Sequence, residues 1–328
     1  MERKPFKILC IDGGGIKGLF SAQILSKFES VFKTSISEQF DLICGTSTGG
    51  IIALAASAKV PMSDVVRFYK EKGPVIFAQN KKKGLGRLLL FFRQLFYKGK
   101  YDNVELKKAL TEVFGEKRIS ESSNLLCIPA FDIINATPRV FKKDYRKFTE
   151  DDRKTYVDVA LATSAAPTFL PIHKIGSSQY VDGGVWANNP SLVGLMEYLY
   201  QFSNDDRFDG VDILSISSLE IPQGCAPKRP NSSFVNWRGD LMELFSTGQA
   251  KNIAKLFEFL KGKFKFPMNY TRISNAPLSK KQLNIIDMDN ASEDSLTTLQ
   301  SIGEATAIKV KMREDVEKFF TTGRTIIF

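Results

Sequence analysis

A serine stands at the centre of the sequence GTSTG, over residues 45–49, between an apolar strand-like segment and an apolar helix-like segment. The small residues around Ser47 permit the tight strand-to-helix turn that is called a nucleophile elbow. Such a turn lifts the serine hydroxyl out at the strand end, and the following helix points its positive end at charge that develops there. The pattern predicts a nucleophilic serine, with a plain turn of small residues as the alternative.

A second glycine-rich turn, DGGGIKG over residues 12–18, also joins a strand to a helix. Consecutive glycines leave backbone N–H groups free to converge on an anion. A dinucleotide-binding loop would need an acidic residue at the end of the second strand, where Cys44 and Ser47 stand instead. An oxyanion hole for acyl transfer is therefore the better interpretation. Lys17 either adds positive charge beside this hole or is a solvated side chain.

The base is the next question, because the chain holds a single histidine, His173. Its place after two prolines, in PTFLPIHKIG, is more typical of a strand end or a surface position than of a catalytic triad. Asp182, in QYVDGGVWANNP, is the better candidate, since the two following glycines let another segment approach closely. A carboxylate with a pKa of about 3.9 is a weak base. In a desolvated site beside a serine it can still accept the hydroxyl proton.

Taken together, these motifs resemble those of the patatin-like phospholipases. That family combines a DGGGx[RK]G loop, a GxSxG elbow, an AxxAxP segment and a DG[GA] motif. The chain has them in this order at residues 12–18, 45–49, 162–167 and 182–184. The resemblance implies a serine lipid acyl hydrolase of the phospholipase A type, which cleaves glycerolipid esters with a Ser-Asp dyad and without a metal or cofactor.

The resemblance also implies roles for individual residues. Ser47 would be the nucleophile and Asp182 the base. The oxyanion hole would be formed by Gly13, Gly14 and Gly15. The positions that support these motifs would be Lys17, Gly18, Gly45, Gly49, Gly183 and Gly184.

The elements that must position these residues follow from the spacing of apolar residues. The first 60 residues alternate strand, helix, strand and helix, at 6–11, 16–32, 40–44 and 51–58, which predicts a parallel sheet covered on both faces. Further strands are expected at 125–135, 137–142, 179–181 and 211–216. Further helices are expected at 63–72, 103–114, 155–164, 190–202, 234–260 and 292–320.

This pattern predicts a three-layer α/β/α fold with a mainly parallel central sheet. Residues 1–205 would form the patatin-like catalytic core. Residues 206–328 would add the remaining strand and a helical C-terminal part that packs on the same domain.

The net charge of +10 is concentrated in one stretch, because residues 81–100 contain seven Lys or Arg and no Asp or Glu. Such a patch indicates an anionic partner: lipid headgroups, a nucleotide or nucleic acid. If residues 79–101 are helical, their basic ends and aromatic middle suit a membrane-surface helix or a lid over the active site. A buried helix with solvated ends fits the same pattern.

Neither a signal peptide nor a membrane-spanning segment is expected, and the four cysteines show no disulfide or metal spacing. A cytoplasmic protein that acts at the inner face of the cell membrane is predicted. The chain length and the tail GEATAIKVKMREDVEKFF look like those of bacterial phospholipase effectors that cyclic nucleotides switch on in anti-phage signalling.

That narrower likeness implies a membrane phospholipid substrate, a cyclic dinucleotide activator and a homo-oligomer on activation, with no DNA or RNA partner. Two alternatives stay open. One is a constitutive soluble esterase or thioesterase on the same fold, and the other is a non-catalytic nucleotide-binding signalling module.

Overall fold

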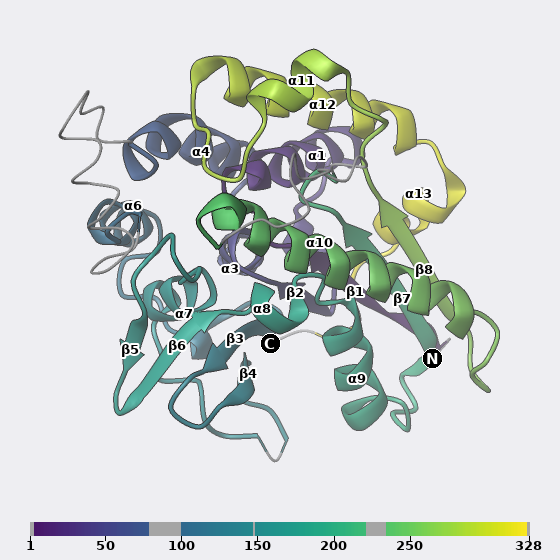
Figure 1. The fold of residues 1–328 in the computed structure, drawn as a ribbon. Coiled ribbons are helices and arrows are strands. Elements are labelled where there is room, and N and C mark those ends of the chain that lie inside the picture. The colour runs from purple at the N-terminus through teal and green to yellow at the C-terminus, as the bar shows by residue number, and fades with distance from the viewer. Residues whose placement is uncertain (1–2, 79–99, 147, 221–233, 327–328) are drawn as a thin grey trace, which may run out of the picture.

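The computed structural model describes residues 3–78, 100–146, 148–220 and 234–326 (Figure 1). The predicted lid or membrane segment, 79–101, lies outside these ranges except for its last two residues. No helix within the ranges is long and apolar enough to cross a bilayer.

An eight-stranded sheet runs through the described part of the chain in the order β5-β6-β3-β2-β1-β7-β8, with β4 also paired to β3. The pairs among β3, β2, β1, β7 and β8 are parallel, whereas β4, β5 and β6 pair antiparallel at one edge. The mainly parallel sheet is thereby confirmed. The strands are β1 (Lys4–Ile11), β2 (Leu42–Gly45), β3 (Leu125–Asp132), β4 (Thr137–Phe141), β5 (His173–Ile175), β6 (Ser178–Asp182), β7 (Phe208–Ile216) and β8 (Met268–Ile273).

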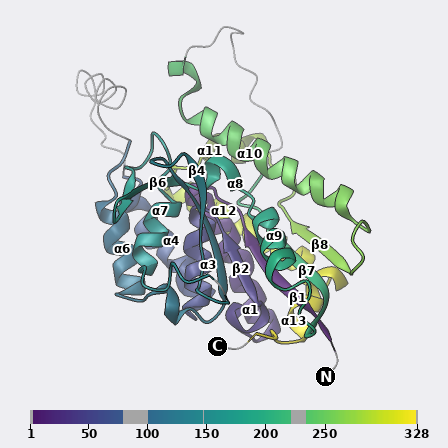
Figure 2. The ribbon, with the colours of Figure 1, turned by 90° about the horizontal axis from the view of Figure 1, so that it is seen from below.

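Helices cover both faces of this sheet, so the molecule has three layers: helices, sheet and helices (Figures 1 and 2). Short 3-10 turns precede α1 and β3, at Gly15–Lys17 and Ile119–Glu121. The helices are α1 (Gly18–Phe32), α2 (Ile36–Gln39), α3 (Thr48–Ser57), α4 (Met62–Ile76), α6 (Val104–Phe114), α7 (Tyr156–Thr163), α8 (Gly184–Ala187), α9 (Ser191–Gln201), α10 (Phe234–Leu260), α11 (Lys280–Ile285), α12 (Glu293–Val310) and α13 (Glu314–Thr321).

Strand β1 explains why both faces are covered. Leu9 and Ile11 pack into the core formed with α1, α3 and α12. Ile8 and Cys10 point to the opposite face and pack with α9 and α10. Successive side chains of a strand alternate between the two faces, so a strand that is buried on both sides needs a continuous apolar run. All four side chains are fully buried.

The C-terminal third differs from the prediction. It contributes two strands to the sheet, since β8 follows β7, and the pattern at 292–320 is two helices, α12 and α13, rather than one. β8 escaped prediction because its sequence, MNYTRI, alternates only in part and carries an arginine, so it lacks the continuous apolar run of the other central strands. Because β7 and β8 join the same sheet as β1, we propose that 1–205 and 206–328 form one domain.

Helix α4 begins one residue earlier than expected. The expected range was 63–72, whereas the helix starts at Met62 with Pro61 at its N-cap and continues to Ile76. A proline at this end loses nothing by lacking an N–H, because the first N–H groups of a helix have no partner within it.

Candidate active site

Ser47 sits in a tight turn between β2 and α3, as the GTSTG pattern predicts. Its backbone angles, φ 56° and ψ −123°, lie in a region that a residue with a side chain rarely adopts. The turn has no room for larger neighbours. A Cβ on Gly45 would lie 2.1 Å from the carbonyl oxygen of Gly49, and one on Gly49 would lie 2.2 Å from that of Ile11.

The turn is fixed from two sides by threonines. The N–H of Ser47 donates to Oγ1 of Thr163 at 3.0 Å, and the Thr163 hydroxyl donates to the carbonyl of Pro129 at 2.5 Å. On the other side, the Thr46 hydroxyl donates to the carbonyl of Ala187 at 2.6 Å. Thr163 belongs to the AxxAxP segment, for which the sequence offered no role, and the contact with Ser47 now supplies one.

Asp182 ends β6 and meets Ser47 across the top of the sheet. The N–H of Gly184 donates to Oδ1 of Asp182 at 2.7 Å, and the Ser47 hydroxyl lies close enough to the carboxylate to affect its pKa. Burial raises the pKa of Asp182 to about 6, while the Ser47 hydroxyl and the Gly184 N–H act in the opposite direction. The carboxylate is therefore ionised at neutral pH and is a stronger base than an exposed aspartate.

His173 lies elsewhere. It begins β5, and its Nε2 lies 3.1 Å from Oδ1 of Asp158 on α7. It is not among the described residues that line the cavity around Ser47. Among the described residues that line this cavity, Asp182 is the only one with a carboxylate.

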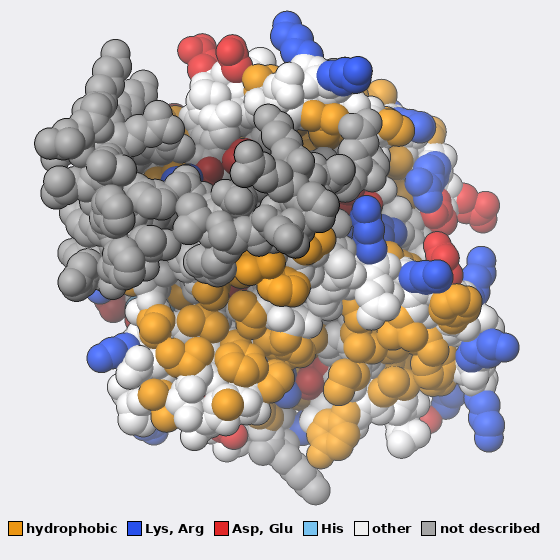
Figure 3. All heavy atoms as spheres, viewed as in Figure 1, with side chains coloured by type: hydrophobic (Ala, Val, Ile, Leu, Met, Phe, Trp, Pro, Cys, Tyr) orange, Lys and Arg blue, Asp and Glu red, His pale blue; other side chains and the backbone are white. Residues whose placement is uncertain are grey.

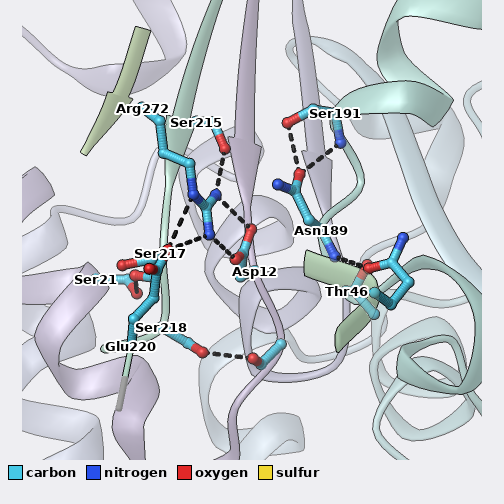
Figure 4. Close-up of polar contacts among 12 residues, drawn as sticks. Asp12, Ser21, Thr46, Asn189, Ser191, Ser215, Ser217, Ser218, Glu220 and Arg272 are labelled. Carbon is cyan, nitrogen blue, oxygen red and sulfur yellow. Dashed lines mark hydrogen bonds and ion pairs between the residues drawn. The ribbon is translucent and has the colours of Figure 1, made fainter. Parts of the chain in front are cut away.

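The residues 12–18, here called the glycine loop, are held by distant segments. The N–H of Gly13 donates to the carbonyl of Asn188 at 3.1 Å, and the Ser218 hydroxyl donates to the carbonyl of Gly13 at 2.5 Å (Figure 4). The N–H of Ile16 donates to the carbonyl of Met288 at 2.9 Å. The Gly13 N–H is thus already occupied, although the sequence assigned it to the oxyanion hole.

Gly14 and Gly15 lie against the same cavity as Ser47 and differ from Gly13. Within the described ranges their N–H groups have no hydrogen-bond acceptor. Gly15 has φ +59°, and a Cβ there would lie 2.2 Å from the carbonyl oxygen of Met288. A Cβ on Gly14 would lie 2.3 Å from Oγ of Ser218. Two N–H groups are therefore free beside the serine, where only glycine fits.

An ionic network that the sequence did not reveal lies at Asp12, the first residue of the glycine loop. Arg272 of β8 contacts the two carboxylate oxygens of Asp12 at 2.6 and 3.3 Å, and it also contacts Glu220 at 2.8 Å and Ser215 at 2.7 Å (Figure 4). Asp12 is 2% exposed, and burial raises its pKa against the opposing effect of Arg272. The only signal in the sequence was an arginine within a short alternating segment.

Lys17 is neither solvated nor free. Its side chain is buried, and its Nζ lies 2.8 Å from Oε1 of Glu243 on α10. The lysine of the DGGGx[RK]G motif therefore joins the glycine loop to the helix that lies over it.

The remaining supporting glycines are also confined. A Cβ on Gly18 would lie 2.2 Å from Oγ1 of Thr48, and one on Gly183 would lie 2.3 Å from the carbonyl oxygen of Pro129. Gly184 has more room, with Oδ1 of Asp182 at 3.1 Å from such a Cβ.

A cavity with about 860 Å³ of empty space, open mouth included, reaches Ser47. Its wall is mostly apolar, which suits a hydrocarbon chain rather than a polar substrate. No cluster of three potential metal ligands occurs in the described segments. The apolar lining residues include Ile51, Phe68, Ile76, Phe77, Leu106, Phe169, Leu170, Met242 and Met288.

A mainly parallel α/β sheet with a serine elbow beside an apolar cavity is typical of lipid ester hydrolases. The chain belongs to the patatin-like phospholipases, because the model of that family, described as "Patatin-like phospholipase", matches residues 9–194.

Two bacterial relatives are similar over nearly the whole chain. The chain is 31% identical to the cGAMP-activated phospholipase of Pseudomonas aeruginosa, covering 92% of this chain and 88% of that protein. It is 29% identical to the cGAMP-activated phospholipase of Vibrio cholerae, covering 93% and 91%. Among solved structures, human GIVD cytosolic phospholipase A2 aligns with a TM-score of 0.45 at 9% identity, over 96% of this chain and 60% of that one.

Proposed function

We propose that Ser47 and Asp182 form a catalytic dyad that hydrolyses acyl esters of membrane phospholipids. The observation that carries this proposal is that Ser47, in its strained turn, and the buried carboxylate of Asp182 line the same apolar cavity, where the hydroxyl is close enough to affect the raised pKa of the carboxylate. Family membership supports the same chemistry.

In the first half of the reaction, Oγ of Ser47 attacks the acyl carbonyl carbon while its proton moves to Asp182. The carbonyl oxygen becomes an oxyanion, which the N–H groups of Gly14 and Gly15 stabilise. The positive end of α3 points at the same place. The intermediate then expels the lysolipid alkoxide, which takes the proton from Asp182, and an acyl-serine ester remains.

In the second half, water replaces the alcohol. The oxygen of this water attacks the acyl-serine carbonyl while Asp182 accepts a proton from the water. The same N–H groups stabilise the second oxyanion. Collapse of this intermediate returns the proton to Oγ of Ser47, releases the fatty acid and regenerates the dyad.

We also propose that a cyclic dinucleotide activates the enzyme at the inner face of the cell membrane, with a homo-oligomer as the active form. Two relatives that cover most of the chain are named as cGAMP-activated phospholipases, which supports this regulation. An unregulated phospholipase in the cytoplasm would damage its own membrane. Such an activator must bind the active state more tightly than the resting one, because a ligand with equal affinity for both states does not change the equilibrium between them.

The experiment compares fatty-acid release from phospholipid vesicles by the wild-type protein and by Ser47→Ala, with and without a panel of cyclic dinucleotides. Release that needs both Ser47 and a nucleotide supports the full proposal. Full activity without nucleotide would contradict the proposed regulation and favour a constitutive esterase. Equal release by Ser47→Ala and wild type would remove the dyad and favour the non-catalytic signalling module.

A further inference from the structure

A second basic stretch runs from the middle of α10 to the start of β8, over residues 251–266. It contains five lysines, four phenylalanines and a single acidic residue, Glu258. All five lysines are exposed: Lys251, Lys255, Lys261, Lys263 and Lys265. Neither the fold nor the proposed reaction uses these charges.

Large apolar side chains are exposed on the same layer of the molecule. Phe259 on α10 is 65% exposed, and on α9 Met196 and Tyr200 are 60% and 83% exposed. The Nζ of Lys255 lies 5.9 Å from the centre of the Phe259 ring, so charge and aromatic surface are adjacent. Figure 3 shows apolar side chains gathered over α9, with Lys and Arg side chains around them. We call Met196, Tyr200, Phe259 and the five lysines the α9–α10 face.

The two helices present this face as one surface, because their inner sides pack together. Leu195 of α9 is buried in one core with Ile253 of α10. The ring of Tyr198 packs against that of Phe266, just beyond α10, with the ring centres 5.5 Å apart. Both helices lie on the same side of the sheet (Figures 1 and 2).

Helix α10 also connects this face to the candidate active site. Helix α10 supplies Met242 and Ser246 to the wall of the cavity around Ser47, and Lys251 follows less than two turns later. A partner on the α9–α10 face would therefore lie beside the structural element that borders the substrate cavity.

We propose that the α9–α10 face docks the protein on a bilayer of anionic phospholipid. This inference rests on the proposed phospholipase function and names the surface that brings the cavity to its substrate. Each lysine close to an anionic membrane strengthens binding by about fivefold. Exposed aromatic and apolar side chains between lysines enter the boundary between headgroups and acyl chains.

A second copy of the chain fits this face less well than a membrane does. In a two-fold symmetric dimer the same patch meets itself, so the five lysines would face the same five lysines. With Glu258 as the only acidic residue of the stretch, these charges would repel each other. An anionic bilayer supplies the opposite charge and an apolar interior together.

The test uses the full chain and vesicles of phosphatidylglycerol mixed with phosphatidylcholine. The face variant combines Lys255→Glu, Lys263→Glu and Phe259→Ser. We expect it to sediment with these vesicles at least tenfold more weakly than wild type, and raised salt should weaken wild-type binding. Hydrolysis of a short-chain soluble ester should be unchanged, because none of these residues lines the cavity.

The matched control carries the same kinds of change on the opposite side of the sheet, where α12 packs on α1. It combines Lys280→Glu, Lys309→Glu and Ile308→Ser, at positions that are exposed in α11 and α12. We expect it to bind vesicles like wild type. Circular dichroism and thermal unfolding confirm that both variants are folded.

Three results would overturn the docking face. In the first, the face variant binds vesicles as strongly as wild type does. In the second, the control variant loses as much vesicle binding as the face variant. The third is wild-type protein that does not bind anionic vesicles with or without a cyclic dinucleotide. A face variant that turns an oligomer into a monomer, with vesicle binding intact, would assign the surface to self-association. Failure of the proposed function is distinguishable, because vesicle binding would persist without acyl hydrolysis.

Discussion

The serine elbow and the glycine loop both border the same cavity, yet they are held in different ways. The elbow closes through backbone hydrogen bonds between its own residues, and Thr163 and Ala187 add one support each from further along the chain. The N–H of Gly49 donates to the carbonyl of Thr46 at 2.8 Å, and that of Ile51 donates to the carbonyl of Ser47 at 3.1 Å. The glycine loop takes its main supports from far along the chain, at Asn188, Ser218, Arg272 and Met288.

This difference separates two tasks of a serine hydrolase. The strained turn that exposes the nucleophile can be encoded by a few small residues. The free N–H groups beside it depend on how the C-terminal third packs against β1. A mutation in β8 or near Met288 can therefore reach the oxyanion position without touching Ser47.

The largest effect is expected at the dyad. Ser47→Ala and Asp182→Asn should each lower kcat/KM by about 10⁴-fold or more, and the double variant should be little worse, because the two residues act as a unit. Steady-state kinetics on a phospholipid and on a soluble ester measure this.

His173→Ala is the control for the dyad, since its partner is Asp158 and it lies outside the cavity lining. It should retain most of the activity. A His173→Ala protein as inactive as Ser47→Ala would show that the dyad assignment is wrong.

The glycine loop comes second. Gly14→Ala and Gly15→Ala should each lower kcat by about a hundredfold or more, the scale of a lost oxyanion donor. Ser218→Gly should restore part of the activity of Gly14→Ala, because the obstacle there is a side chain. No such rescue is expected for Gly15→Ala, whose obstacle is the backbone of Met288.

Gly115→Ala is the matched control for these variants. Gly115 has φ +54° with no other atom within 4 Å of an added Cβ, so the substitution should cost stability on the order of 1 kcal/mol and leave kcat unchanged. Near-normal turnover of both Gly14→Ala and Gly15→Ala would remove the oxyanion role from the loop.

The third effect sharpens the contrast between local and distant support. Arg272→Met leaves the buried carboxylate of Asp12 unpaired, which should lower the free energy of unfolding by about 3–5 kcal/mol. We expect kcat to fall by about tenfold with KM little changed, because the glycine loop loses its anchor. Arg272→Lys should recover part of the loss.

Chemical denaturation and kinetics test this pair. The matched control is Arg313→Met, whose partner Asp315 is exposed on the surface, so its cost should be about 0–1 kcal/mol. Equal costs for Arg272→Met and Arg313→Met would mean that the network around Asp12 does not hold the loop.

The smallest effect is a pH dependence set by Asp182, whose pKa is raised to about 6. Below this pH the carboxylate is protonated and cannot act as a base, so kcat/KM should fall about tenfold per pH unit.

Above a pH of about 6 the ionised carboxylate of Asp182 is buried, which lowers the stability of the folded protein. Asp182→Asn should therefore stabilise the protein at about pH 8 by on the order of 1–3 kcal/mol, and this gain should vanish below about pH 4. A value of kcat/KM that stays constant from pH 7 to pH 5 would contradict the role of Asp182 as the base.

Much of this molecule could be predicted from the sequence. The alternation of apolar runs placed β1, α1, β2 and α3 within a few residues of their observed bounds, because these strands are buried on both faces and need continuous apolar sequence. GTSTG identified the elbow, since its glycines are required by contacts inside the turn and with β1. The three-layer fold and the family followed from these same local signals.

Other features depended on the tertiary structure. Nothing local indicates that the Gly13 N–H is occupied by Asn188, so only Gly14 and Gly15 remain free. β8 was missed because its arginine is acceptable inside the sheet only when Asp12 neutralises it. The exposed residues of the α9–α10 face also share one surface only because the inner sides of α9 and α10 are buried in the same core. The sequence by itself determined the elements that each segment forms from its own residues. The tertiary structure decided which distant groups hold the glycine loop, because those contacts exist only after the sheet has assembled.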